Sequence, residues 1–187
     1  MRCYVLLLPL LALAACKPPP TDASVAGAKS AMSNRPSEPI ASPDTKGAIW
    51  GNSQTEGRIL YGLPGEAPLL ALACDAVGGQ PVIRITRHAL ADMGAGAFAA
   101  FIGNGHASRI PIDAREVDGA SVWQAELPAN DPRLEVLTGR REVAVTIPGA
   151  GRLVVNPSAR PGEVIEACRA LAPSPMPSAS ASAAPAR

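Results

Sequence analysis

Three dipeptides that favour tight turns divide the middle of the chain into short segments. Asn104-Gly105 is the strongest signal, because both residues accept the positive φ angles that a two-residue hairpin turn requires. Gly78-Gly79 and Asp118-Gly119 are of the same kind. Apolar and polar residues alternate beside these turns, most clearly over residues 121–127. This pattern predicts antiparallel strands joined by hairpins.

The expected fold is mainly β. Short apolar segments separated by Gly, Pro, Asn and Asp predict an antiparallel β-sandwich or barrel of about 7–8 short strands with a C-terminal helix. That helix is expected after Pro161, with an apolar stripe composed of Val164, Ile165, Cys168 and Leu171. Residues 89–102 are ambiguous between helix and strand; we expect a helical turn over 89–93 and a strand over 97–102.

The first residues have the layout of a secretory signal peptide. Arg2 precedes an apolar run over residues 5–15, which is too short to cross a bilayer as a helix of about 20 residues. The run ends in Leu13-Ala14-Ala15-Cys16, which resembles the lipobox of bacterial lipoprotein precursors. This resemblance implies cleavage before Cys16 and acylation of Cys16. The alternative is an ordinary secretory signal with a chance cysteine.

The same resemblance implies a location and a domain organisation. Lys17, rather than Asp, follows the cysteine, which implies the outer membrane, facing the periplasm. We expect four parts: a signal peptide (1–15), a lipidated, disordered Pro/Ala/Ser tether (16–46), one globular domain (47–172) and a disordered tail (173–187). Both flanking segments lack the large apolar side chains that would offset the entropy of ordering.

Four cysteines are present, and the lipoprotein resemblance leaves two of them for the domain. Cys3 would leave with the signal peptide and Cys16 would be acylated. Cys74 and Cys168 are then expected to form a disulfide in an oxidising compartment. In the chain-entropy model, closing this loop stabilises the fold by about 4 to 5 kcal/mol. The alternative is a redox or metal-binding pair, but neither cysteine lies in a CxxC motif.

Charge and motifs favour few kinds of chemistry. With 17 basic and 16 acidic side chains, the chain lacks the excess of Lys and Arg that nucleic-acid binding needs, and no nucleic-acid partner is expected. No cofactor motif occurs, and no cofactor or metal is expected.

His88 and Asp92 could form a weak metal pair, but we expect His88 to be a solvated residue at a strand end. Four arginines could form a cationic patch, although a mixed solvated face is favoured: Arg84, Arg87, Arg109 and Arg115.

Catalysis has one nominal candidate. His106, Ser108 and Asp113 could form a base, a nucleophile and an orienting carboxylate, but a strand face offers no oxyanion hole, and we expect a non-enzyme. The favoured function is a membrane-tethered binding or scaffold module that contacts an envelope protein or peptidoglycan. An inhibitor of a cell-wall hydrolase is a variant of this function. Residues 72–75 (Leu-Ala-Cys-Asp) are similar to a strand start in small lysozyme-inhibiting lipoproteins, but their Ser-Gly-containing inhibitory loop has no match here.

Overall fold

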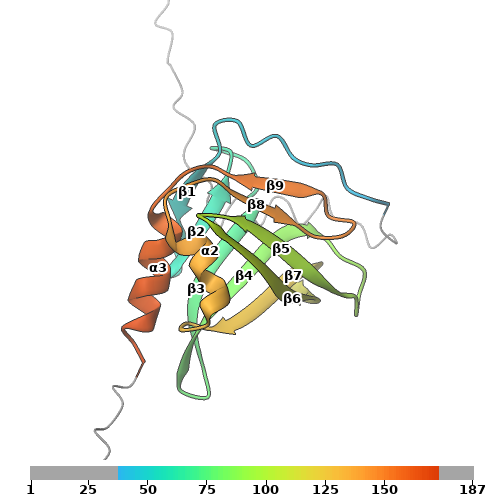
Figure 1. Ribbon diagram of the computed structural model, residues 1–187. Helices are drawn as coiled ribbons and strands as arrows, with labels where there is room; N and C mark the ends of the chain where they lie inside the picture. The colour runs from blue at the N-terminus through green and yellow to red at the C-terminus, as the bar shows by residue number, and fades with distance from the viewer. Residues whose placement is uncertain (1–37, 173–187) are drawn as a thin grey trace, which may run out of the picture.

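The structure is a computed structural model that describes residues 38–172. Nine antiparallel strands form one sheet that curls into a half-barrel, and α3 follows the last strand (Figure 1). The expected mainly β fold with a C-terminal helix is confirmed. The signal segment, Cys16 and the tail from residue 173 lie outside the described residues.

The elements are short, as the spacing of turn residues predicts. The strands are β1 (Ile49–Asn52), β2 (Arg58–Gly62), β3 (Leu70–Val77), β4 (Gln80–Leu90), β5 (Gly96–Gly103), β6 (His106–Val117), β7 (Ala120–Pro128), β8 (Val143–Thr146) and β9 (Arg152–Val155). The helices are the 3₁₀ turn η1 (Pro132–Leu134), α2 (Glu135–Thr138) and α3 (Arg160–Arg169).

The sheet has the order β1-β2-β3-β4-β7-β6-β5-β8-β9, so β1 and β9 are its two edges. Two-residue turns join β3 to β4, β5 to β6 and β6 to β7. These turns are the three dipeptides that the sequence singles out. At the middle turn, Asn104 and Gly105 have φ angles of 52° and 82°, the positive values expected for a hairpin of this length.

Residues 89–102 contain no helix. The expected strand over 97–102 is confirmed within β5, but the expected helical turn over 89–93 is wrong. β4 continues to Leu90 instead, and the amide of Ala91 still donates to the carbonyl of Ser121 at 3.1 Å. Pairing with β7 therefore overrides the helix propensity of the local alanines.

Apolar side chains from the concave face of the sheet and from the helices form one core. Leu72, Ile85 and Ile110 contribute from strands, and Leu137 and Ile165 from α2 and α3; each is at most 1% exposed. α3 packs across β3 and its neighbours β2 and β4. None of the described helices has the length and apolar character needed to span a bilayer.

The last residues that the sequence assigns to the tether, 38–46, pack on the domain. Together with residues 47 and 48 they form a segment that we call the strap, which runs alongside the free edge of β9. The Ile40 amide donates to the carbonyl of Gly149 at 2.8 Å, and the Arg152 amide donates to Ser42 Oγ at 3.0 Å. A Cβ on Gly151 would lie 2.9 Å from the Ile40 carbonyl oxygen, so this glycine lets the strap approach closely. The strap covers an edge that would otherwise be open to pairing.

One side chain links β2, the strand next to the β1 edge, to the opposite edge of the sheet at β9. Tyr61, on β2, is fully buried, and its hydroxyl donates to the carbonyl of Val154 at 3.0 Å and accepts from the amide of Asn156 at 2.9 Å. Both backbone groups face the free edge of β9, where a partner strand would otherwise take them. The Asn156 side-chain amide continues this closure by donating to the carbonyls of Thr45 and Ala48, at 2.8 and 2.9 Å.

Replacing Tyr61 with Phe tests this closure. Tyr61→Phe keeps the ring but leaves a buried carbonyl and a buried amide without their partner, so we expect a loss of about 1–3 kcal/mol in the free energy of unfolding. Urea denaturation followed by circular dichroism measures this loss. An unfolding midpoint equal to that of the parent would show that the hydroxyl does not join the two edges.

Candidate functional site

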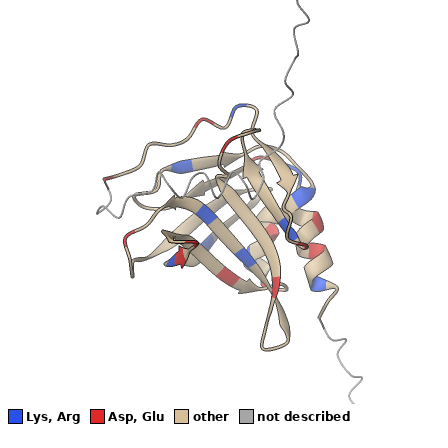
Figure 2. Ribbon diagram, turned by 180° about the vertical axis from the view of Figure 1, so that it is seen from behind, with Lys and Arg blue, Asp and Glu red and all other residues tan. Residues whose placement is uncertain are grey.

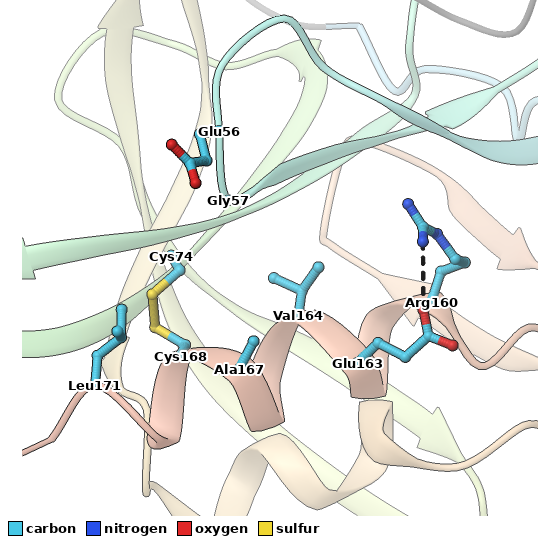
Figure 3. Close-up of a pocket in the computed structure, with 9 residues that line it drawn as sticks. All are labelled: Glu56, Gly57, Cys74, Arg160, Glu163, Val164, Ala167, Cys168 and Leu171. Atoms are coloured by element: carbon cyan, nitrogen blue, oxygen red, sulfur yellow. Dashed lines mark hydrogen bonds and ion pairs between the residues drawn. A yellow bond between two sulfur atoms is a disulfide. The ribbon is translucent and has the colours of Figure 1, made fainter.

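A groove of about 510 Å³ lies between α3 and the turn that joins β1 to β2; we call it the α3 groove (Figure 3). Its volume falls in the range of about 300–1,000 Å³ that is typical of ligand pockets. One wall comes from the turn and from β3, and the other from α3. The lining residues are Glu56, Gly57, Cys74, Arg160, Glu163, Val164, Ala167, Cys168 and Leu171.

The apolar stripe that the sequence predicts on α3 divides between the core and the groove. Ile165 and Cys168 are fully buried. Val164 is only partly buried, and Leu171 is 71% exposed; both line the groove. α3 ends at Arg169, so Leu171 lies beyond the helix, whereas the sequence places it on the helical stripe. Val164 packs against the core and also lines the groove.

The groove has an apolar centre with charged side chains on both sides of it: Arg160 and Glu163 near the start of α3, and Glu56 on the turn near the disulfide (Figure 3). Val164, Ala167 and the disulfide form the apolar part (Figure 3). At the start of α3, the Arg160 guanidinium pairs with Glu163 at 3.3 Å and also donates to the side-chain oxygen of Asn52. Such a groove suits a ligand that is mostly apolar and carries a polar group at one end.

The Cys74–Cys168 disulfide forms the floor of this groove and ties β3 to α3. Their Cα atoms are 5.5 Å apart, and 94 positions separate them in the sequence. This is the pairing that the sequence favours over a redox or metal-binding pair. With both sulfurs bonded to each other, the two cysteines supply a covalent anchor and an apolar surface.

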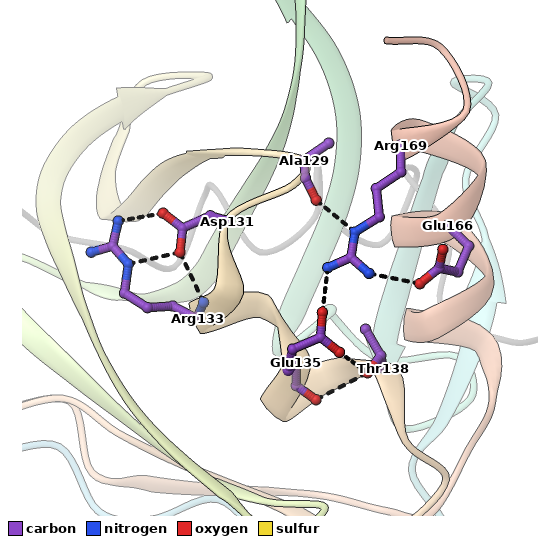
Figure 4. A network of polar contacts seen from close by, with 7 residues as sticks. All are labelled: Ala129, Asp131, Arg133, Glu135, Thr138, Glu166 and Arg169. Carbon is purple, nitrogen blue, oxygen red and sulfur yellow. Dashed lines mark hydrogen bonds and ion pairs between the residues drawn. The ribbon is translucent and has the colours of Figure 1, made fainter. Parts of the chain in front are cut away.

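A network around Arg169 holds the other side of α3 (Figure 4). Its guanidinium donates to the carbonyl of Ala129 at 2.8 Å and to carboxylate oxygens of Glu135 and Glu166, each at 2.7 Å. The hydrogen bond from Arg169, together with one from Thr138, lowers the pKa of Glu135. The network connects α3 to α2 and to the end of β7.

A close backbone contact also sets the position of α3. A Cβ on Gly162 would lie 2.7 Å from the carbonyl oxygen of Thr138, nearer than real Cβ atoms approach. Glycine at this position therefore lets the first turn of α3 rest directly on the end of α2. Together with the disulfide and Arg169, this contact keeps one wall of the α3 groove fixed.

A second exposed feature lies on the convex face of the sheet, over β5, β6, β8 and β9. Phe98 and Ile102 point outward from β5 and are 63% and 61% exposed. Between them, one row across the four strands is Arg109, Ala100, Thr146 and Arg152. We call this surface the β5 face. Elsewhere on the ribbon, basic and acidic residues are interspersed (Figure 2).

The nominal catalytic residues do not converge. His106, Ser108 and Asp113 all lie on β6. Successive side chains of a strand point to opposite faces of the sheet, so Asp113, an odd number of residues from the other two, faces away from them. Asp113 pairs instead with Arg115 at 3.4 Å. The structure thus places His106 and Ser108 on one side of β6 and their expected orienting carboxylate on the other.

Two neighbouring residues of β4 are more buried than the sequence predicts. His88 is largely covered rather than solvated, and within the described part of the chain its Nε2 atom has no hydrogen-bond partner. Burial lowers its pKa to about 4, and the charges of Arg58 and Arg87 add to this effect. Arg87, which we expected on a solvated face, is only 4% exposed, and burial lowers its pKa to about 10. Its guanidinium donates hydrogen bonds to the carbonyls of Leu69 and His88.

Comparisons with known proteins identify no relative. No family model, curated protein or solved structure matches the chain. Within residues 38–172, no three His, Cys, Asp or Glu side chains lie in a group that could hold a metal ion, so His88 and Asp92 gain no third ligand there.

Removing the disulfide should loosen the wall of the groove and the fold together. We expect Cys74→Ala combined with Cys168→Ala to lower the free energy of unfolding by about 2–5 kcal/mol. Urea denaturation with and without a thiol reductant measures the effect, and reductant should destabilise only the parent. If the parent is insensitive to reductant and matches the double variant, the two cysteines do not form this bond.

His88 should make the protein sensitive to acid. Between about pH 6.5 and pH 4 the unfolded chain binds a proton at His88 that the folded chain does not, so this residue reduces stability as the pH falls, by up to about 3 kcal/mol. His88→Gln should lose less stability than the parent between about pH 7 and pH 4.5 in urea denaturation. His106→Gln, at an exposed histidine, is the control and should behave as the parent does. Equal losses in all three proteins would contradict this account of His88.

Proposed function

We propose that this chain is a lipid-tethered envelope protein that binds a partner protein through the α3 groove. The observation that carries the proposal is the groove itself: a partly apolar concavity beside a disulfide, lined by the partly buried Val164 of α3 and by Leu171, which is exposed just beyond the helix. Binding sites commonly combine an apolar surface with a few placed polar groups. Arg160 and Glu163 supply such groups at one end.

The groove is better suited to binding than to bond-making. Its sulfurs are bonded to each other, and Glu163 is paired with Arg160. The lining offers no histidine, serine or lysine, and Glu56 is the one lining carboxylate besides Glu163, so no base lies beside a nucleophile there. An apolar side chain or a short apolar stretch of a partner protein fits its size and chemistry, with a polar group near the start of α3.

The tether belongs to the same proposal and is supported by the lipobox resemblance at Leu13–Cys16. Acylation at Cys16 would hold the domain at the membrane, and the disulfide fits an oxidising compartment. Intact-mass measurement of the protein extracted from membranes tests this part. The expected N-terminus is an acylated Cys16, and Cys16→Ser should abolish both the processing and the added mass.

Site-specific cross-linking in living cells tests the groove. A benzophenone side chain at Leu171, which lines the groove and is exposed, should give a discrete adduct with one partner. The same side chain at Val77, exposed at the tip of the β3–β4 hairpin, is the matched control and should not. Adding Ala167→Arg, which fills the groove from an exposed helix position, should reduce the Leu171 adduct by about tenfold or more, as expected for loss of a buried contact.

The outcome is informative only if the variants fold. Thermal unfolding of Ala167→Arg followed by circular dichroism should match the parent within a few degrees, because the substitution lies outside the core. Adducts of equal intensity from Leu171 and Val77, or a Leu171 adduct that persists with Ala167→Arg, would show that the α3 groove is not the binding site.

A further inference from the structure

The β5 face combines exposed apolar side chains with cations. Phe98 and Ile102 lie on the same side of β5, which places them about 13 Å from each other along the strand. Pro111 is opposite Phe98 on β6 and Ala107 is opposite Ile102, and both are exposed. Of the large aromatic side chains in residues 38–172, Phe98 alone is exposed.

Arginines lie at both ends of the row between these two residues. Arg109 on β6 and Arg152 on β9 are exposed, and neither side chain forms an ion pair with a described residue. The acidic neighbour on the same face of β6 is Asp113, which Arg115 neutralises at 3.4 Å. Within the four strands the outward charged side chains therefore sum to a positive charge around an apolar centre, and the carboxylates outside these strands include Asp44 of the strap and Glu142 just before β8.

The shape of this surface favours a lipid partner over a protein pocket. The β5 face is the outer side of a curled sheet, so its apolar side chains project from a convex surface (Figure 1). A protein partner would need a concavity that matches both side chains, whereas the headgroup region of a bilayer accommodates projecting apolar groups without one. Arginine on the flanks suits the anionic headgroups of that region.

The path of the chain gives an independent argument. The strap reaches the domain along β9, and Ser42 accepts a hydrogen bond from the amide of Arg152, a residue of the β5 face. The chain that leads back to Cys16 thus joins the domain at the border of this face. A tether of about twenty residues would have a root-mean-square reach of only about 25 Å, so a lipid at Cys16 would keep this border near the membrane.

We propose that the β5 face docks on an anionic phospholipid surface, with Phe98 and Ile102 inserted among the headgroups and with Arg109 and Arg152 against their phosphates. This inference rests on the proposed tether, which supplies the proximity that two apolar side chains cannot supply alone. It orients the domain so that α3, on a different side of the half-barrel, is free to receive its partner (Figure 1).

The test uses the chain from Cys16 onward, coupled through the Cys16 thiol to a maleimide lipid in vesicles of phosphatidylethanolamine and phosphatidylglycerol. Phe98→Trp places a fluorophore in the β5 face, and Val77→Trp, at an exposed apolar site on the β3–β4 hairpin, is the matched control. The parent fluorescence is subtracted from both. Lipids brominated near the headgroup should quench the fluorescence that Phe98→Trp adds by about twofold and leave the control unchanged.

The pattern of quenching decides between docking and its absence. Quenching of Phe98→Trp that falls with Arg109→Glu and Arg152→Glu, and with added salt, supports docking. Equal quenching at both positions, or no quenching at position 98, overturns docking. Docking is also overturned if a cross-linker at position 98 captures an envelope protein in cells while Phe98→Trp remains unquenched on vesicles. The lipid in this experiment is attached chemically, so the result does not depend on whether Cys16 is acylated in cells. Failure of docking and failure of the proposed acylation are therefore distinguishable.

Discussion

A single phenol hydroxyl connects β2, the strand next to one edge of the sheet, to the opposite edge at β9, in a sheet that does not close through its own backbone. Tyr61 reaches from β2 to the free edge of β9. There its hydroxyl donates a hydrogen bond to one carbonyl and accepts one from an amide, as a neighbouring strand would. Its aromatic ring packs against Trp50 of β1, with centroids 5.2 Å apart, so the same side chain contacts the other edge strand as well.

The position of α3 depends on a different set of constraints. A covalent bond at Cys168, a guanidinium network at Arg169 and a backbone contact at Gly162 hold the helix on three sides. None of these contacts involves the seam that Tyr61 closes. The two proposed binding surfaces therefore lie on different parts of the molecule: the α3 groove lies between α3 and the β1–β2 turn, and the β5 face lies on the outer side of the sheet.

The sequence predicts best where structure follows from one or two residues. The turn at Asn104-Gly105 needs only local φ preferences, and the stripe on α3 needs only helical spacing. Pairing partners decide the rest. β4 extends through the expected helical turn because β7 lies beside it, and the burial of Arg87 and His88 follows from the covering of β4 by its neighbours. The α3 groove needs the turn at Glu56 to face a helix near the other end of the domain, and no local pattern predicts that.

The strap places several hydrogen bonds in series where the chain enters the domain. They join it to the β8–β9 turn at Ile40, to β9 at Ser42 and to the Asn156 side chain at Thr45. Tension applied from the N-terminal side would meet these bonds one after another, and each could yield before the load reached β1 and the seam at Tyr61. The strap would therefore detach and lengthen under load before the core unfolds.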